Sequence, residues 1–181
     1  MSEMHDGLGS QLIATLELIE DGETARAQAA DSIRECLDGL RLAIHSLEPT
    51  DDDLLTVLGG LRYRLEARLK KRGIALLWQV RDIPKLNSLT PQNVLHILRI
   101  LQEAFTNIVK HARARTITVK TGFTQEQVFI EVADDGCGFI RNPEGGRGLC
   151  NMRKRAQALG ARLELLPSPS GTTVSLHLSR R

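Results

Sequence analysis

Apolar side chains recur at helical spacing through the first 49 residues of the chain. One face of the first run is apolar, with Leu8, Leu12, Leu16 and Ile19. The second run follows the a and d positions of a heptad repeat, with Ile33, Leu37, Leu40, Ile44 and Leu47. A polar stretch containing Gly22 separates the two runs, so the pattern predicts a helical hairpin over residues 1–49.

Two short amphipathic helices cannot bury both of these apolar stripes by themselves. Dimerisation into a four-helix bundle would bury them, and we therefore expect a homodimer formed through the hairpin. The alternative is a hairpin that docks on the remainder of its own chain.

The pattern changes at Pro49 and the acidic run that follows it, which we interpret as the start of a second domain over residues 50–181. Helices are predicted over 54–72, 91–112 and 151–159, and strands over 74–80, 116–121, 128–133, 162–166 and 172–178. Thr90 is the expected N-cap before Pro91, and Gly160 the expected stop of the last helix. The predicted fold class is α+β, with helices on one face of a mixed sheet.

Composition excludes several classes of function. The 181 residues carry a net charge of +2 with acidic and basic residues interleaved, and only 3% are aromatic, so we expect no nucleic acid partner. No apolar run reaches membrane-spanning length and no signal peptide is present, so we expect no membrane contact by this segment. Cys36, Cys137 and Cys150 have no metal-binding spacing and are interpreted as reduced thiols of a cytoplasmic protein.

Two glycine clusters carry the strongest indication of chemistry. The first, Asp134-Asp135-Gly136-Cys137-Gly138, follows a predicted strand, where a carboxylate and bare backbone can meet a flat ligand. The second, Gly145-Gly146-Arg147-Gly148-Leu149, precedes a predicted helix, whose N-terminal N–H groups suit a phosphate. Together they suggest a nucleotide pocket.

A polar face on the 91–112 helix could complete such a pocket. Glu103 and Asn107 are one turn apart, and a carboxylate beside an amide oxygen suits Mg²⁺ that is shared with phosphates. Lys110 and His111 follow one turn later and could meet phosphate oxygens. Taken alone, these residues could equally form an ordinary solvated helix face.

The order of these motifs resembles the ATP-binding domain of the GHKL superfamily, which includes gyrase, Hsp90, histidine kinases and MutL. Glu103-x-x-x-Asn107, Asp134-x-Gly136-x-Gly138, Gly146-x-Gly148-Leu149 and Gly171-Thr172 all fall in the matching structural contexts. The resemblance spans residues 50–181 and implies a GHKL (Bergerat-type) α/β sandwich that binds ATP and Mg²⁺.

The resemblance also implies a role for each site residue. Asp134 would accept the adenine amino group, Gly136 and Gly138 would shape the base pocket, and Thr172 would support the adenine. Asn107 would ligate Mg²⁺ with Glu103 close by. Gly146, Gly148 and Leu149 would line the nucleotide, with the two glycines facing the phosphates, and residues 139–147 would form a lid.

The N-terminal segment Met4-His5-Asp6-Gly7-Leu8 resembles the phosphoacceptor helix of sensor histidine kinases of the NarX/DesK-like subgroup. By this resemblance His5 is the phosphoacceptor and Asp6 the general base, although periodicity alone would place His5 on the apolar seam. Ser10 stands where much of the subgroup has a glutamine, which puts phosphatase activity in doubt.

The resemblance implies an ATP-dependent protein histidine kinase of a two-component system. It would autophosphorylate on His5 and pass the phosphoryl group to an aspartate in a response-regulator receiver domain. We expect the catalytic core of a longer sensor protein, which can be anchored in the inner membrane, with a truncated first helix. The alternative is a non-catalytic ATP-binding and dimerisation module of a signalling protein.

Overall fold

The computed structural model describes residues 54–86, 89–138 and 147–180. The chain divides into two units, Met1–Glu48 and Pro49–Arg181, and all described residues belong to the second. The expected hairpin over 1–49, with His5 and Asp6, lies outside the described residues. It therefore remains a prediction.

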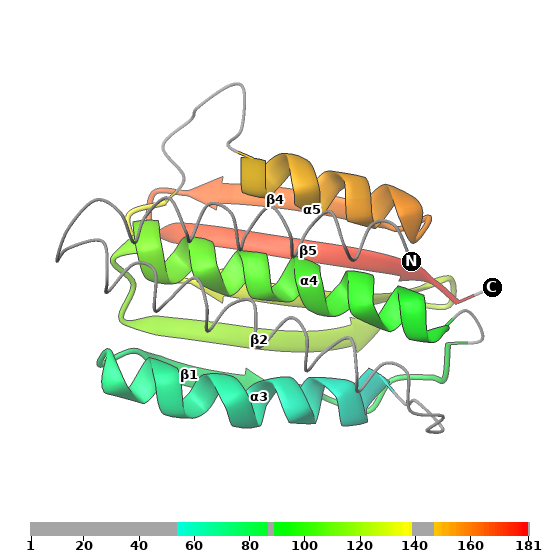
Figure 1. Cartoon of the computed structure of the whole chain (residues 1–181), viewed down its shortest axis with the longest axis horizontal. Helices are drawn as coiled ribbons and strands as arrows, with labels where there is room; N and C mark the ends of the chain where they lie inside the picture. The colour runs from blue at the N-terminus through cyan, green and yellow to red at the C-terminus, as the bar shows by residue number, and fades with distance from the viewer. Residues whose placement is uncertain (1–53, 87–88, 139–146, 181) are drawn as a thin grey trace, which may run out of the picture. The chain divides into compact units, whose positions relative to one another are not determined.

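The second unit is a layer of helices on a mixed sheet (Figure 1). Its elements are α3 (Leu54–Lys71), β1 (Ala75–Gln79), α4 (Pro91–Asn107), the π-helical turn η1 (Ile108–Ala112), β2 (Thr116–Phe123), β3 (Gln127–Asp134), α5 (Arg147–Ala158), β4 (Arg162–Ser168) and β5 (Gly171–Ser179). The five strands lie in the order β1-β2-β3-β5-β4. Only the β1–β2 pair is parallel among them. The α+β class and the mixed sheet are confirmed.

The core lies between the helices and one face of the sheet. Alternate residues of β2 and β3 are buried there, including Ile117 and Ile130. The helices contribute leucines and isoleucines at helical spacing, among them Leu58, Leu61 and Ile97. Each such side chain stabilises the fold by about 1.5–3 kcal/mol through burial, so the central strands hold the chain that follows them in a fixed position.

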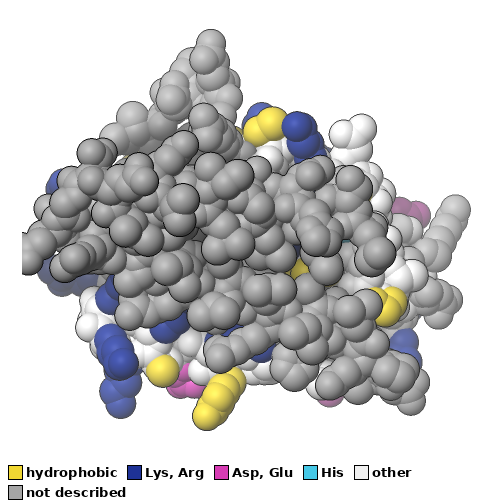
Figure 2. Space-filling view, viewed as in Figure 1, with side chains coloured by type: hydrophobic (Ala, Val, Ile, Leu, Met, Phe, Trp, Pro, Cys, Tyr) yellow, Lys and Arg dark blue, Asp and Glu magenta, His cyan; other side chains and the backbone are white. Residues whose placement is uncertain are grey.

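Helix ends follow the sequence signals. The Thr90 hydroxyl accepts a 3.2 Å hydrogen bond from the backbone N–H of Asn93 and so caps α4. Gly73 and Gly160 have φ angles of 70° and 60°, which glycine adopts readily after a helix. Arg68, Lys70 and Lys71 in the last turn of α3 complement the helix dipole. Lys and Arg side chains project at the lower left of Figure 2, where this turn lies.

One predicted boundary is wrong, and one helix differs in its last turn. The helix expected over 91–112 has the predicted ends, but it is α-helical only to Asn107 and then widens into η1, followed by Arg113 in the left-handed region at φ 54°. The last helix begins at Arg147 rather than at residue 151, because Arg147, Gly148 and Leu149 of the second glycine cluster form its first turn instead of preceding it. No helix in the described part of the chain is long and apolar enough to cross a membrane.

Asp135 fastens the start of β2 to the end of β3. Its Oδ1 accepts 2.8 Å hydrogen bonds from the backbone N–H groups of Thr116 and Arg115. Its own N–H donates to the Thr116 carbonyl oxygen at 3.3 Å. The Thr116 bond, followed by the Arg115 bond, lowers the pKa of the Asp135 carboxyl from its ordinary value of 3.8 because both favour the charged form.

We expect Asp135→Asn to lower the free energy of unfolding at neutral pH by about 1 kcal/mol, since it weakens two charge-assisted hydrogen bonds. A carboxyl whose folded pKa is depressed stabilises the fold above its unfolded pKa and loses that effect as the pH falls through the folded value. Urea denaturation should therefore show the gap between parent and variant closing below about pH 4.

The matched control for this prediction is Asp82→Asn, which makes the same change at an exposed aspartate after β1. It should leave the pH dependence of stability unchanged. A gap between Asp135→Asn and the parent that stayed constant across the acid range would contradict the assignment.

Candidate functional site

The carboxylate of Asp134 is fixed by two backbone amides. Asp134 is the last residue of β3, which pairs with β2 on one side and β5 on the other. Its Oδ1 accepts from the Gly136 N–H at 2.9 Å, and its Oδ2 accepts from the Thr172 N–H at 3.2 Å. The half-buried carboxylate thus joins the end of β3, the first glycine cluster and the start of β5, with lone pairs left to accept a further donor.

The glycines of the first cluster are required by the protein's own backbone. A Cβ at Gly136 would collide with the carbonyl oxygen of Ala112, the residue that ends η1. That carbonyl also accepts a 2.8 Å hydrogen bond from the Cys137 N–H. Gly138 has a φ of 72°, and a Cβ there would meet the Ser168 carbonyl oxygen. These contacts account for both glycines, and their expected role in a base pocket remains a prediction.

Gly171 closes the same region from the other side. Its φ of 131° is in the range that favours glycine, and a Cβ there would collide with the carbonyl oxygen of Asp134. The close approach lets the Thr172 N–H reach the Asp134 carboxylate. The Gly171-Thr172 motif predicts a role for Thr172 alone, and the structure adds this role for Gly171.

Glu103 and Gly148 meet across the gap between α4 and α5. Glu103 is half-buried on α4, one turn before Asn107, which is the last α-helical residue. Gly148 is the second residue of α5, and a Cβ on it would collide with Oε1 of Glu103. The Glu103 carboxylate therefore lies against the first turn of α5. This contact brings together two predicted site residues from different helices.

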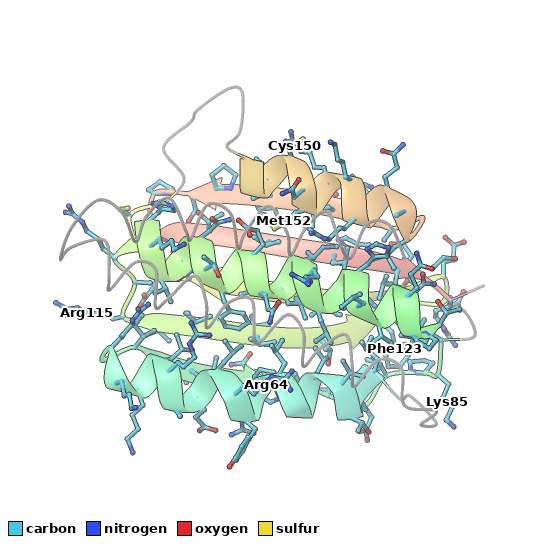
Figure 3. The ribbon with its side chains drawn as sticks, viewed as in Figure 1. Arg64, Lys85, Arg115, Phe123, Cys150 and Met152 are labelled. Carbon is cyan, nitrogen blue, oxygen red and sulfur yellow. The ribbon has the colours of Figure 1, made fainter. Side chains whose placement is uncertain are left out.

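Leu149 lies in the core rather than in an open pocket. It is 8% exposed and shares the inner face of α5 with Met152, which is 1% exposed. In Figure 3 Met152 lies on the side of α5 that faces α4, whereas Cys150 projects from the opposite side. Packing is sufficient to explain Leu149, and its expected contact with a nucleotide stays a prediction.

The remaining predicted residues divide into two groups. Lys110 and His111 are exposed on η1, and the His111 carbonyl oxygen accepts from the Cys137 thiol at 3.5 Å, which places this turn beside the first glycine cluster. Of the lid expected over 139–147, residues 139–146, which include Gly146, lie outside the described residues, as do His5 and Asp6. Their predicted roles are untested.

Sequence reasoning missed the parts of the site made by backbone. The side chains of this segment do not predict the π turn or the position of the Ala112 carbonyl oxygen at its end. The structural role of Asp135 could have been predicted. It follows Asp134 directly at the end of a strand, where an aspartate often accepts hydrogen bonds from backbone amides.

The oxygen donors on α4 suit a hard cation that also binds a ligand. They are too few to hold such a cation by themselves. No cluster of three or more His, Cys, Asp or Glu side chains that could hold a metal ion exists among the residues described. Glu103 and Asn107 offer two oxygen donors one turn apart, and Mg²⁺ in such sites takes its other ligands from water and phosphate.

We expect alanine at Gly136 and alanine at Gly148 to change the free energy of unfolding by different amounts. We expect Gly136→Ala to lower the free energy of unfolding by about 2 kcal/mol, because the new methyl meets a backbone carbonyl that cannot move alone. Gly148→Ala should cost less than about 1 kcal/mol, because the mobile end of Glu103 can turn aside.

Urea denaturation of the two variants measures this difference. Gly59→Ala is the control, since nothing lies within 4 Å of a Cβ there and a helical alanine should be neutral or stabilising. Equal losses for Gly136→Ala and Gly148→Ala would refute the distinction.

Comparison with known proteins agrees with this geometry. Residues 92–181 match the family described as histidine kinase-, DNA gyrase B-, and HSP90-like ATPase. The sensor histidine kinase LnrJ of Bacillus subtilis (strain 168) is 30% identical over 171 residues, which cover 87% of this chain and 41% of LnrJ. The nitrate/nitrite sensor protein NarQ of Escherichia coli (strain K12) is 32% identical over 196 residues, covering 96% of this chain and 33% of NarQ.

A solved structure supports the fold. The histidine kinase domain of a blue-light activated histidine kinase from Erythrobacter litoralis has a TM-score of 0.66 at 18% identity, covering 98% of this chain and 94% of that one. The chain spans less than half the length of the two curated relatives named above. The resemblance inferred from the motifs is confirmed: residues 92–181 belong to the histidine kinase-, DNA gyrase B-, and HSP90-like ATPase family, and the chain is similar to sensor histidine kinases over most of its length.

Proposed function

We propose that this chain is an ATP-dependent histidine kinase core that phosphorylates its own His5 and donates the phosphoryl group to a response-regulator aspartate. The observation that carries the proposal is the Asp134 carboxylate, held by the N–H groups of Gly136 and Thr172. It ties two of the family's motifs, Asp134-x-Gly136-x-Gly138 and Gly171-Thr172, into one oriented acceptor. The proposal places this segment in the cytoplasm, where ATP is available.

The base end of the site follows from this acceptor. A carboxylate whose two oxygens already accept from backbone amides cannot turn away, so its remaining lone pairs have fixed directions. Such an acceptor distinguishes an exocyclic amino group from a carbonyl, because a carbonyl would bring two acceptors together. Asp134 would therefore favour adenine, and half-buried Thr172, whose N–H bonds the same carboxylate, would support the base with its hydroxyl.

The phosphate end is formed by α4 and the first turn of α5. The space that a Cβ on Gly148 would fill is occupied by Oε1 of Glu103, and Asn107 lies one turn further along α4 and offers a second oxygen donor. These residues fit Mg²⁺, which when bound would neutralise charge on the transferring phosphoryl group. Lys110 and His111 on η1 would supply further positive charge.

Transfer to His5 needs a neutral imidazole nitrogen aligned with the γ-phosphorus. The nitrogen lone pair forms the new P–N bond while the bond to the bridging oxygen breaks and ADP leaves. Asp6 would orient the ring and accept its proton. We further propose that the hairpin over 1–49 forms the dimer that presents His5, and that a receiver domain then takes the phosphoryl group.

The alternative function, a module that binds ATP without transferring phosphate, requires the same pocket. No contact among the described residues favours it, and it differs from the kinase in a single measurable outcome. Phosphoryl transfer to the chain decides between the two.

We predict that the purified chain, incubated with γ-labelled ATP and Mg²⁺, acquires acid-labile, alkali-stable label. His5→Gln should abolish the label, and Asn107→Ala should reduce the rate by about 10- to 100-fold through weaker metal positioning. His177→Gln is the control, since His177 contacts Ser175 at 3.0 Å and Glu164 at 3.5 Å on β5 and β4, away from the proposed site.

Label that survived in His5→Gln would overturn the assignment of the acceptor. Nucleotide binding without label in any variant, from a sample shown by light scattering to be dimeric, would favour the binding module. A sample that is dimeric and binds no nucleotide would refute both functions.

A further inference from the structure

Glu103 places a negative charge where the proposed function places phosphate. A Cβ on Gly148 would collide with Oε1 of Glu103, so the carboxylate lies directly against the first turn of α5. The N–H groups of that turn have no partners within the helix and carry the positive end of the helix dipole. In this structure, therefore, the anion at the start of α5 is the protein's own side chain.

The contact depends on the absence of a side chain at Gly148. Glu103 projects from α4 and Gly148 belongs to α5, and α4 and α5 pack through buried residues such as Leu101 and Met152. Because both helices are held by the core, the contact persists unless the end of the Glu103 side chain turns aside. Gly148 thus acts as a positioning residue for Glu103.

Two anions at one helix end repel unless a cation lies between them. The phosphates of a nucleotide bound as proposed would face Gly148, and the Glu103 carboxylate would lie next to them in a partly desolvated gap. Asn107 lies one turn further along α4 and adds an uncharged oxygen donor to the same side. A divalent cation would convert the repulsion into attraction.

We propose that Glu103, lodged against Gly148, excludes metal-free nucleotide from the site and so makes nucleotide affinity depend on a divalent cation. This inference rests on the proposed function. It assigns to Glu103 a gating role in binding, separate from any contribution to phosphoryl transfer.

The test compares the dissociation constant of ATP in excess EDTA with that in excess Mg²⁺, measured by titration calorimetry on the whole chain. The parent should bind ATP at least about tenfold more weakly in EDTA. Glu103→Gln keeps the size of the side chain and removes its charge, so it should improve binding in EDTA by about tenfold and bring the ratio of the two constants near one.

Two controls isolate the charge at this position. Glu131→Gln makes the same change on β3, at a residue paired with Lys120 and Ser175 in the sheet register, and should keep the parent's ratio. Adenosine carries no phosphate, so its affinity should be the same in the parent and in Glu103→Gln. Circular dichroism establishes that each variant is folded.

The outcomes separate the inference from the function on which it rests. A folded parent that binds no ATP in Mg²⁺ would refute the proposed function. A parent that binds ATP in Mg²⁺, together with a Glu103→Gln variant that keeps the parent's ratio, would overturn the gating role and leave the function standing.

Discussion

The fixed carboxylate of Asp134 is the interaction on which the site depends. It accepts from the Gly136 N–H and the Thr172 N–H, so one side chain determines how the loop after β3 and the start of β5 approach each other. The buried alternate residues of β3, such as Ile130 and Val132, hold the end of that strand in place. The packing of the core thereby fixes the position of the Asp134 carboxylate. A nucleotide site needs such a fixed acceptor before the ligand binds.

The glycines around this acceptor do two kinds of work. Gly136 and Gly171 are glycine because backbone carbonyl oxygens of Ala112 and Asp134 occupy the space of a side chain. Gly148 is glycine because the end of Glu103 occupies it. The first two contacts are part of the fold, and the third links two helices through a side chain that can move. A glycine in such a motif can therefore be required by the fold or by the site. The atoms that would meet its Cβ show which of the two applies.

The sequence predicted the elements and the motifs well because both depend on side-chain pattern. Alternation along β3 and the capping residue Thr90 were sufficient to place their elements, and the spacing from Glu103 to Asn107 was sufficient to place both on one helix. The π turn over Ile108–Ala112 could not be predicted, since side-chain spacing does not distinguish one π turn from a continued α-helix. The hydrogen bond from Cys137 to the Ala112 carbonyl at its end joins residues distant in sequence. The early start of α5 was missed because glycines were interpreted as preceding the helix.

Two carboxylates at opposite ends of the site face opposite requirements. Asp134 is held by donors and would meet a neutral amino group, so its charge favours binding without any cation. Glu103 lies against the first turn of α5, at the positive end of the helix dipole, where the phosphates of a nucleotide would oppose it. In the proposed site, Asp134 selects the base and Glu103 makes binding depend on a metal, although both residues are carboxylates. Their separation follows from the fold, because β3 positions one carboxylate and α4 the other.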